Sequence, residues 1–133
     1  MPYTVFTFQY RQPSLSPEAY ADHYENVHLP LVQAVTGDAF PKKHTRYYIK
    51  RGPASSDDTN AVGAPLVFYG QPEDIGFDCV AIMEFEDLPA FIRFKDAYEK
   101  SPRKQEMDDD EAKFLVKSKL QAFAVEDARI TTA

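Results

Sequence analysis

Two histidines stand where they could take part in proton transfer. His28 follows Tyr24 by four residues in a stretch with helical spacing, so it should project near the buried side of a helix. His44 begins the run His-Thr-Arg-Tyr-Tyr-Ile, which is typical of a strand. Because an imidazole both donates and accepts a proton near neutral pH, the pair predicts acid–base chemistry. For His28 the alternative is a core or capping histidine that hydrogen-bonds the backbone.

One face of the strand that carries His44 could bind an anionic or phenolic ligand. Side chains alternate across a strand, so His44, Arg46 and Tyr48 share a face. A guanidinium can hold a carboxylate through two hydrogen bonds, and a tyrosine can hydrogen-bond a phenol. Lys42 is a second candidate for holding the carboxylate. The alternative is an edge strand whose charged side faces water.

The other polar residues are expected to be structural. His23 precedes His28 by five residues, about 140° around an α-helix, so we expect it on the outer face and outside the site. The run Asp108–Glu111 should be the acidic first turn of a short helix. Cys79 lies in an apolar run, as a buried cysteine does. The three histidines lack the spacing of a zinc motif, so we expect neither a metal nor another cofactor.

The elements that must position these residues form two β-α-β units. Ser16-Pro17 predicts the N-terminus of a first helix, with Pro30 bending or shortening it and Gly37 ending it. Tyr20, Tyr24, Val27 and Leu31 should form its apolar stripe, and Asp87 should open a second helix on which Phe91, Phe94 and Tyr98 are core residues. Strands are expected at 3–10, 44–51, 77–85 and 115–125.

A long segment at 52–72 separates the two units. It holds three prolines, three glycines and the run Ser-Ser-Asp-Asp-Thr-Asn, all typical of a loop. Loops of this length are usually functional. We therefore expect a lid or a cavity wall, so that a deletion of residues 55–60 should change turnover more than melting temperature.

This order of elements predicts the ferredoxin-like α+β fold, βαββαβ, with a four-stranded antiparallel sheet and helices on one face. The strands are apolar or aromatic on both sides, as Val5 and Thr7 against Phe6 and Phe8 show. Something must therefore cover the second face of the sheet. A second copy of the chain would do so, which predicts a homodimer.

The composition excludes several classes of protein. The 133 residues, 44% of them hydrophobic and 14% aromatic, fit a single domain over 1–133. A net charge of -6 offers phosphates no overall attraction, so nucleic-acid binding is not expected. The chain has no run of roughly 18 apolar residues and no basic, apolar leader, so we expect neither membrane insertion nor a signal peptide. With one cysteine, these features predict a cytoplasmic protein.

Three motifs resemble the EthD-domain family. The segment 16–31 is similar to the family's first-helix signature, with the core His-Tyr-Glu-x-x-His-x-Pro-Leu at 23–31. Phe-Pro at 40–41 with His-x-Arg-x-Tyr at 44–48, and Asp-Asp-Asp-Glu-x-x-Phe at 108–114, are similar to regions of the fungal branch. The resemblance thus extends along nearly the whole chain.

The resemblance implies a dimeric α+β barrel that acts without a cofactor in an aromatic polyketide pathway, as a decarboxylase or a dehydratase. For decarboxylation, Arg46 or Lys42 would hold the carboxylate while His28 or His44 protonates the carbon, and a neighbouring keto group takes up the electrons. The expected catalytic residues are His28, His44 and Arg46, and the expected substrate-binding residues are Tyr24, Tyr48 and Lys42.

Two alternatives to decarboxylation remain open. Dehydration of a similar polyketide uses the same residue types, so the sequence does not separate the two reactions. A non-catalytic small-molecule-binding or stress-response barrel would tolerate loss of both His28 and His44.

Overall fold

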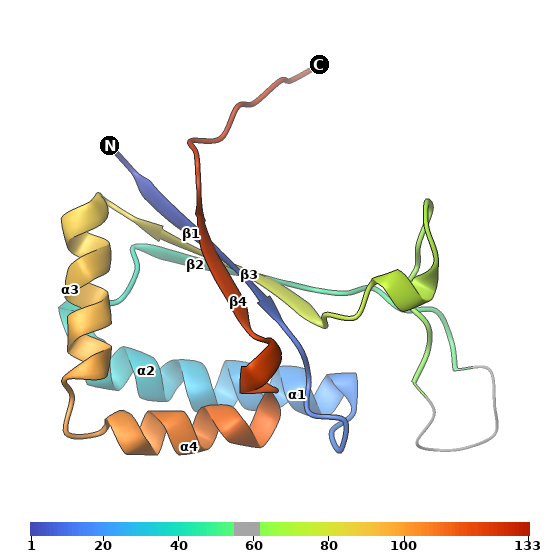
Figure 1. The fold of residues 1–133 in the computed structure, drawn as a ribbon, viewed down its shortest axis with the longest axis horizontal. Coiled ribbons are helices and arrows are strands. Elements are labelled where there is room, and N and C mark those ends of the chain that lie inside the picture. Colours follow the sequence, from blue (N-terminus) through green and yellow to red (C-terminus); the bar gives the residue numbers. More distant parts are fainter. Residues whose placement is uncertain (55–61) are drawn as a thin grey trace.

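The computed structural model describes residues 1–54 and 62–133. The helices form a layer beneath and beside a single sheet, and the C-terminal residues extend away from it (Figure 1). The elements, in chain order, are β1 (Tyr3–Gln9), α1 (Pro17–His23), a π-helical segment (Tyr24–His28), α2 (Leu29–Thr36), β2 (Lys43–Tyr48), β3 (Cys79–Phe85), α3 (Leu88–Glu99), α4 (Lys104–Phe114) and β4 (Gln121–Val125).

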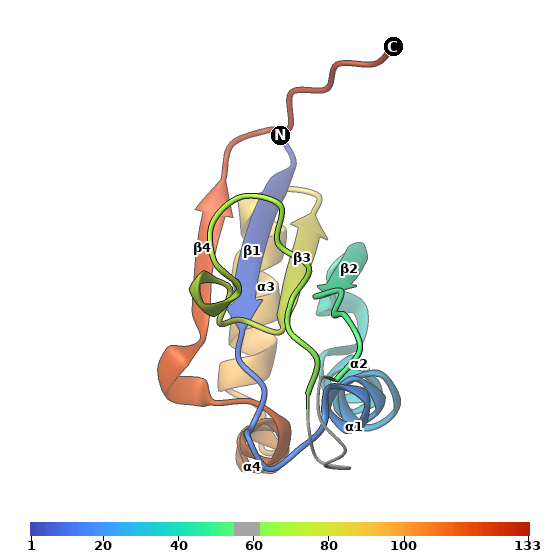
Figure 2. The same ribbon diagram turned by 90° about the vertical axis from the view of Figure 1, so that its right-hand side faces the viewer.

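The sheet has the predicted ferredoxin-like topology. Its four strands lie in the order β2-β3-β1-β4 with every pair antiparallel, so β1 and β3 are central and β2 and β4 are edges (Figure 2). Thr7 faces Ala81 across the central pair, and both side chains point toward the helices and are buried. The prediction of an α+β fold with helices on one face is therefore confirmed.

The first helix begins and ends where predicted. The Ser16 side chain accepts a hydrogen bond from the Ala19 amide, and Gly37 ends the helix with a positive φ of 52°. Pro30 neither shortens nor ends the helix. A π turn comes just before it, in which the Leu29 amide donates to the carbonyl of Tyr24, five residues back.

This π turn changes which residues face the sheet. Regular α-helical spacing predicted an apolar stripe through Val27 and Leu31, but Val27 is 46% exposed. Residues 28, 29, 32 and 36 are the buried ones beyond Tyr24. A π turn holds one residue more than an α turn, so it rotates the following helix and brings His28 onto the buried side.

Two boundaries near the C-terminus differ from the prediction. Helix α4 begins at Lys104, so the run Asp108–Glu111 lies in its middle and not in its first turn. Strand β4 begins at Gln121, because the residues before it form a bridge at Leu115 and a 3₁₀ turn at Lys117–Lys119. The acidic run is therefore free to contribute side chains along the helix.

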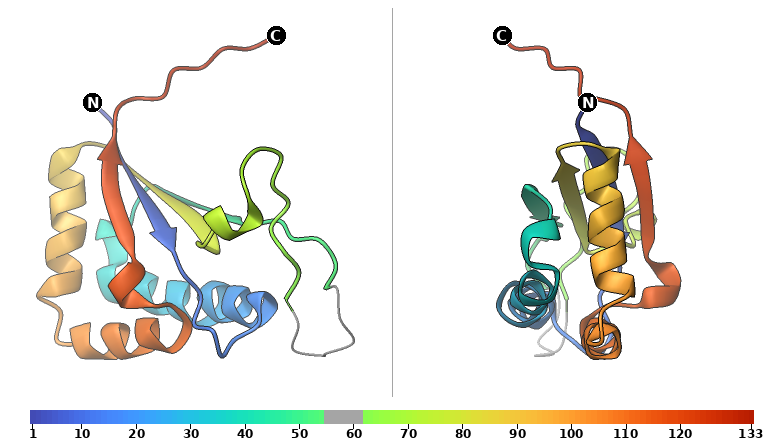
Figure 3. Two further views of the ribbon diagram at one scale, coloured as in Figure 1. Left: turned by 45° about the vertical axis from the view of Figure 1, so that its right-hand side comes forward. Right: turned by 90° about the vertical axis from the view of Figure 1, so that its left-hand side faces the viewer.

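The two faces of the sheet have different surroundings. One face packs on the helices, with α3 standing against the sheet and α1, α2 and α4 across its end (Figure 3). The other face carries Phe6, Phe8, Phe77 and Phe123, whose rings pack on one another with centroids 4.8–6.3 Å apart. On this second face Phe123 stays 43% exposed and Tyr47 of β2 60% exposed.

Asp78 joins three segments at one end of the sheet. Its side chain accepts hydrogen bonds from the Arg11 amide at 2.9 Å and from Arg51 Nη2 at 2.7 Å, and it also pairs with Arg11 Nε at 3.2 Å. Asp78 is only 8% exposed. The ion pairs fix the ends of β1 and β3 and the segment that follows β2.

Candidate active site

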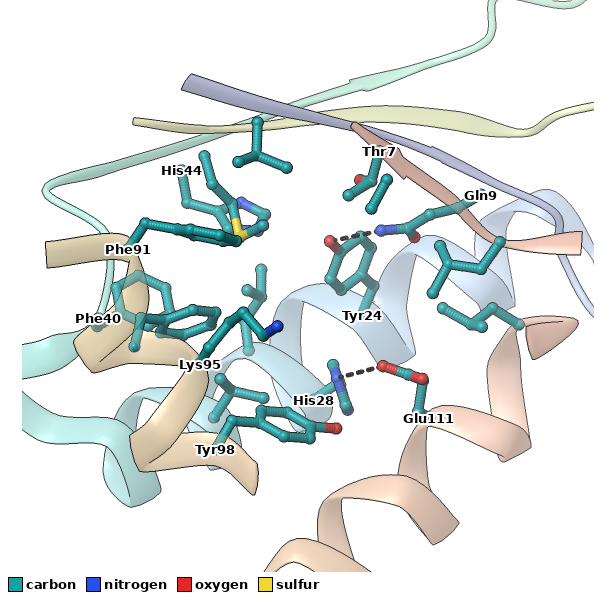
Figure 4. A pocket seen from close by; sticks show the side chains of 18 of the residues that line it. Thr7, Gln9, Tyr24, His28, Phe40, His44, Phe91, Lys95, Tyr98 and Glu111 are labelled. Atoms are coloured by element: carbon teal, nitrogen blue, oxygen red, sulfur yellow. Dashed lines mark hydrogen bonds and ion pairs between the residues drawn. The ribbon is translucent and has the colours of Figure 1, made fainter. Parts of the chain in front are cut away.

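The main cavity lies between the helix layer and the sheet and has a volume of about 440 Å³. Figure 4 shows its polar groups facing a common space from the sheet, the first helix, α3 and α4. The residues that line it are Val5, Thr7, Gln9, Tyr24, His28, Leu29, Val32, Phe40, His44, Met83, Phe91, Phe94, Lys95, Tyr98, Glu99, Glu111, Phe114, Leu115, Leu120 and Ala122.

His28 is the best-positioned proton-transfer group of the cavity. It is only 6% exposed, and its ring packs on Phe114 with centroids 4.9 Å apart. Nδ1 lies 2.9 Å from Oδ2 of Asp110, while Nε2 lies 3.9 Å from Oε2 of Glu111. Because the Asp110 carboxylate accepts a hydrogen bond from Nδ1–H, Nε2 is the nitrogen left to exchange a proton with a ligand.

His23 and His28 share Asp110, which corrects the expectation that His23 lies on an outer face apart from the site. His23 Nε2 is 3.0 Å from Oδ1 of Asp110, and His28 occupies the other oxygen. The 140° separation assumed α-helical geometry. In a π turn, by contrast, residues five apart lie on one side of the helix. Asp110 is thus held between two imidazoles and orients the ring of His28.

His44 also reaches the cavity, and its ring is neutral. Burial, and secondly the Arg46 charge, lowers the pKa of His44 from 6.5 to about 4, so the ring is neutral at pH 7. Arg46 Nη1 donates to Nδ1 of His44 at 3.0 Å, which leaves the ring proton on Nε2. His44 is therefore a neutral hydrogen-bond donor, better suited to stabilising an oxygen than to supplying an acidic proton.

Of the other four predicted residues, three lie outside the main cavity, namely Arg46, Tyr48 and Lys42. Arg46 forms two hydrogen bonds to the Glu25 carboxylate, and the Tyr48 hydroxyl donates to the same group. Partial burial raises the pKa of Glu25, but the bonds from Arg46 and Tyr48 outweigh this and hold it below its usual range. Lys42 is half-exposed and lies 3.6 Å from Glu86. None of the three is placed to hold a carboxylate in the cavity.

Tyr24 reaches the cavity from the first helix, as predicted, and its hydroxyl is held by Gln9. The Gln9 amide nitrogen donates to Tyr24 Oη at 2.9 Å, and its oxygen accepts from Tyr20 Oη at 2.6 Å. Burial raises the pKa of Tyr24 above its usual value, so the phenol keeps its proton. With one lone pair engaged by Gln9, the hydroxyl can donate to a ligand.

Several residues in and behind the cavity wall were missed or misread from the sequence. Met107, Asp110 and Phe114 are all buried at spacings of three and four, and this pattern was the available signal that Asp110 faces inward. Phe91, Phe94 and Tyr98, expected in the core, are half-buried and form the α3 wall. Lys95 on α3 and Glu111 on α4 also line the cavity. Their apolar neighbours in the sequence gave no sign that these charged side chains point inward.

The segment at 52–72 contributes less than expected. Residues 55–61, which include the proposed deletion at 55–60, lie outside the described residues. None of the described residues at 52–54 and 62–72 lines the main cavity. The described ranges also bring together no group of three or more His, Cys, Asp or Glu side chains that could hold a metal ion. No helix at 1–54 or 62–133 is long and apolar enough to cross a membrane.

Comparisons with known proteins agree with the fold. Residues 12–118, well over half of the chain, match the model of the EthD domain. No curated protein matches the chain.

Three solved structures show the same arrangement of elements at low sequence identity. An ethyl tert-butyl ether D (EthD) family protein from Bacillus halodurans is 18% identical, with a TM-score of 0.54 over 96% of this chain and 100% of that one. An EthD-like protein from Ralstonia eutropha is 18% identical, with a TM-score of 0.53 over 92% and 89%. A dimeric ferredoxin-like protein of unknown function from Thermobifida fusca is 14% identical, with a TM-score of 0.50 over 94% and 90%.

Proposed function

Since this chain belongs to the EthD domain family, we propose that it is a cofactor-independent lyase that decarboxylates a hydroxylated aromatic or pre-aromatic polyketide acid. One observation carries the proposal: a buried histidine, His28, is oriented by Asp110 with its free nitrogen facing an apolar cavity. Aromatic side chains on α3 suit a flat ligand, and the polar groups opposite them suit its oxygens.

The reaction needs an electron sink and a proton donor. In a keto acid, the bond between the ring carbon and the carboxylate breaks, carbon dioxide leaves, and the electron pair moves onto the neighbouring keto oxygen. The protonated ring of His28 then transfers its Nε2 proton to that carbon, and the neutral ring regains a proton from solvent. Glu111, 3.9 Å from Nε2, stabilises the protonated ring before the proton is transferred.

His44 of β2 and Tyr24 of the first helix provide donors for the developing enolate. His44 carries its proton on Nε2 and stays neutral at pH 7, and Tyr24 has its hydroxyl proton free. Such fixed donors stabilise charge that forms in the transition state without reorganising. His28 thus acts as the acid, while His44 and Tyr24 bind the oxygen.

Dehydration is the second candidate because His28 and Glu111 supply an acid and a base side by side. Glu111 would remove the α-proton and His28 would protonate the departing hydroxide, so that water leaves and a double bond forms.

Mass spectrometry of a carboxylated anthrone incubated with the pure protein separates the candidates. The proposal expects loss of carbon dioxide, in the presence and in the absence of a chelator. Loss of water would favour dehydration, while gain of oxygen or an unchanged substrate would overturn lyase activity.

The proposed enzyme is a homodimer paired through the open sheet face. The cluster of Phe6, Phe8, Phe77 and Phe123 lies on this face, with Phe123 and Tyr47 largely exposed. An apolar face of this extent favours burial against a like surface. A structural relative from Thermobifida fusca is described as dimeric, which supports the same assembly here.

A further inference from the structure

Lys95 is the one lysine or arginine among the residues that line the main cavity. It stands on the inner side of α3 between Phe91 and Tyr98, four residues after the first and three before the second. Figure 4 shows its ammonium group directed into the space between Tyr24 and His28. A positive charge therefore meets a ligand beside the proposed proton donor.

The ammonium group of Lys95 has no protein counter-ion within 4.0 Å among the described residues. The cations that sequence reasoning favoured are already paired, Lys42 with Glu86 and Arg46 with Glu25. The two carboxylates that share the cavity with Lys95 are Glu111 and Glu99. Glu111 lies 3.4 Å from Lys117 and 3.9 Å from His28. Glu99 follows Lys95 by one turn on the same face of α3 and is exposed as Lys95 is.

We propose that Lys95 binds the carboxylate of the substrate and makes the cavity selective for aromatic acids over neutral aromatic molecules. A lysine ammonium is a compact charge with three donors on a flexible stem, so it can follow an anion that enters beside His28. Because Lys95 is exposed, water screens its charge and its attraction for a carboxylate is moderate. A moderate attraction suits decarboxylation, since a strong ion pair would stabilise a charge that must disappear as carbon dioxide leaves. The choice of an aromatic ligand rests on the proposed function.

The test compares the binding of two matched probes, anthraquinone-2-carboxylate and anthraquinone-2-carboxamide, by titration calorimetry. The wild type should bind the acid about three- to tenfold more tightly than the amide, the range expected of a partly exposed ion pair. Lys95→Met should abolish this preference and leave amide binding unchanged, whereas Lys95→Arg should retain it.

Arg93→Met is the matched control, because Arg93 is a cation on the same helix that does not line the cavity. It should keep the preference for the acid. An equal affinity of the wild type for both probes, or a preference that survives in Lys95→Met, would overturn the proposal. An equal loss of affinity for both probes in Lys95→Met would overturn it as well, because that result would show that Lys95 acts through packing. No turnover is measured, so a wild type that prefers the acid but releases no carbon dioxide would refute the lyase function alone.

Discussion

At the scale of single residues, the site depends on how its two histidines are held. His28 has a carboxylate on Nδ1 and an open Nε2, while His44 has a guanidinium on Nδ1 and stays neutral. The same side chain therefore serves as a proton donor in one place and as a fixed hydrogen-bond donor in the other. Arg46 is a neighbour of His44 on its own strand, but Asp110 comes from a distant helix, which is why the sequence alone could not assign the role of His28.

Replacing Asp110 with asparagine should slow turnover more than it weakens binding. The side-chain amide of the variant would no longer be an obligate acceptor for the Nδ1 proton, so the ring of His28 would lose its fixed orientation. We expect kcat to fall about 10- to 100-fold with little change in KM. The control is Asp109→Asn, one residue earlier in the same run, whose carboxylate is exposed and bonds to Gln105. Equal effects of the two substitutions in steady-state kinetics would contradict the positioning role.

The lowered pKa of His44 predicts a specific loss of stability in acid. Unfolded His44 takes up a proton near pH 6.5, but the folded protein does so only near pH 4. Between these values the unfolded state binds more protons, so the free energy of unfolding falls as the pH falls through this window. The full penalty is about 3 kcal/mol, reached near the lower limit.

Urea unfolding of the wild type and of His44→Gln at several pH values between 6.5 and 4 measures the loss of unfolding free energy that His44 causes. The other titrating groups near His44, which are Glu25, Arg46 and His28, are present in both proteins. The wild type should lose stability relative to the variant as the pH is lowered. A difference that stays constant across the window would show that His44 titrates normally.

At the scale of elements, local signals predicted where helices begin and end but not how the first helix turns. The Ser16 cap and the Gly37 stop depend on neighbouring residues alone. The π turn that precedes Pro30 also has a local cause, the missing amide of proline, but a proline more often bends or ends a helix. That turn moved Val27 outward and brought both His23 and His28 to Asp110.

The ion pairs of Asp78 with Arg11 and Arg51, which we call the Asp78 clamp, give a test at this scale. Asp78→Asn removes a charge that is shared between Arg11 and Arg51. Breaking a buried ion pair leaves its partners uncompensated, so we expect the free energy of unfolding to fall by about 2–4 kcal/mol.

The control for the clamp is Glu126→Gln, which breaks an ion pair with Arg129 that is almost fully exposed. It should change stability very little. Urea denaturation compares the two variants. A cost for Asp78→Asn as small as that of the control would mean that the three segments hold together without the clamp.

At the scale of the whole molecule, the order of elements was enough to predict the sheet. Two β-α-β units with alternating apolar strands leave few compact topologies, and β2-β3-β1-β4 is the ferredoxin-like one. Side-chain alternation also predicted that both faces of the sheet are apolar. The wall that α3 contributes to the cavity could not be foreseen, because Phe91, Phe94 and Tyr98 look like core residues in any amphipathic helix.

The open face of the sheet predicts the assembly. In light scattering at micromolar concentration, the wild type should have twice the 15.1 kDa mass of one chain. Its interface should bury at least roughly 1,200–2,000 Å². Ile82→Lys places a charge opposite Phe6 on this face and should give monomers.

Ile92→Lys is the matched control for the assembly. Ile92 is 48% exposed on α3, on the helix side of the molecule and not on the open sheet face, so this variant should remain a dimer. A monomeric wild type, or an Ile82→Lys variant that stays dimeric, would contradict pairing through the sheet.

The central claim is that His28 supplies the proton in a decarboxylation. The most direct measurement is the rate of carbon dioxide release from a carboxylated anthrone by the wild type and by folded His28→Gln, with a chelator present. The removal of a general acid typically lowers the rate by about 10²–10⁴-fold. We therefore predict carbon dioxide release by the wild type and a loss of this size in the variant. Equal rates for the two proteins, or no release by the wild type, would contradict the claim.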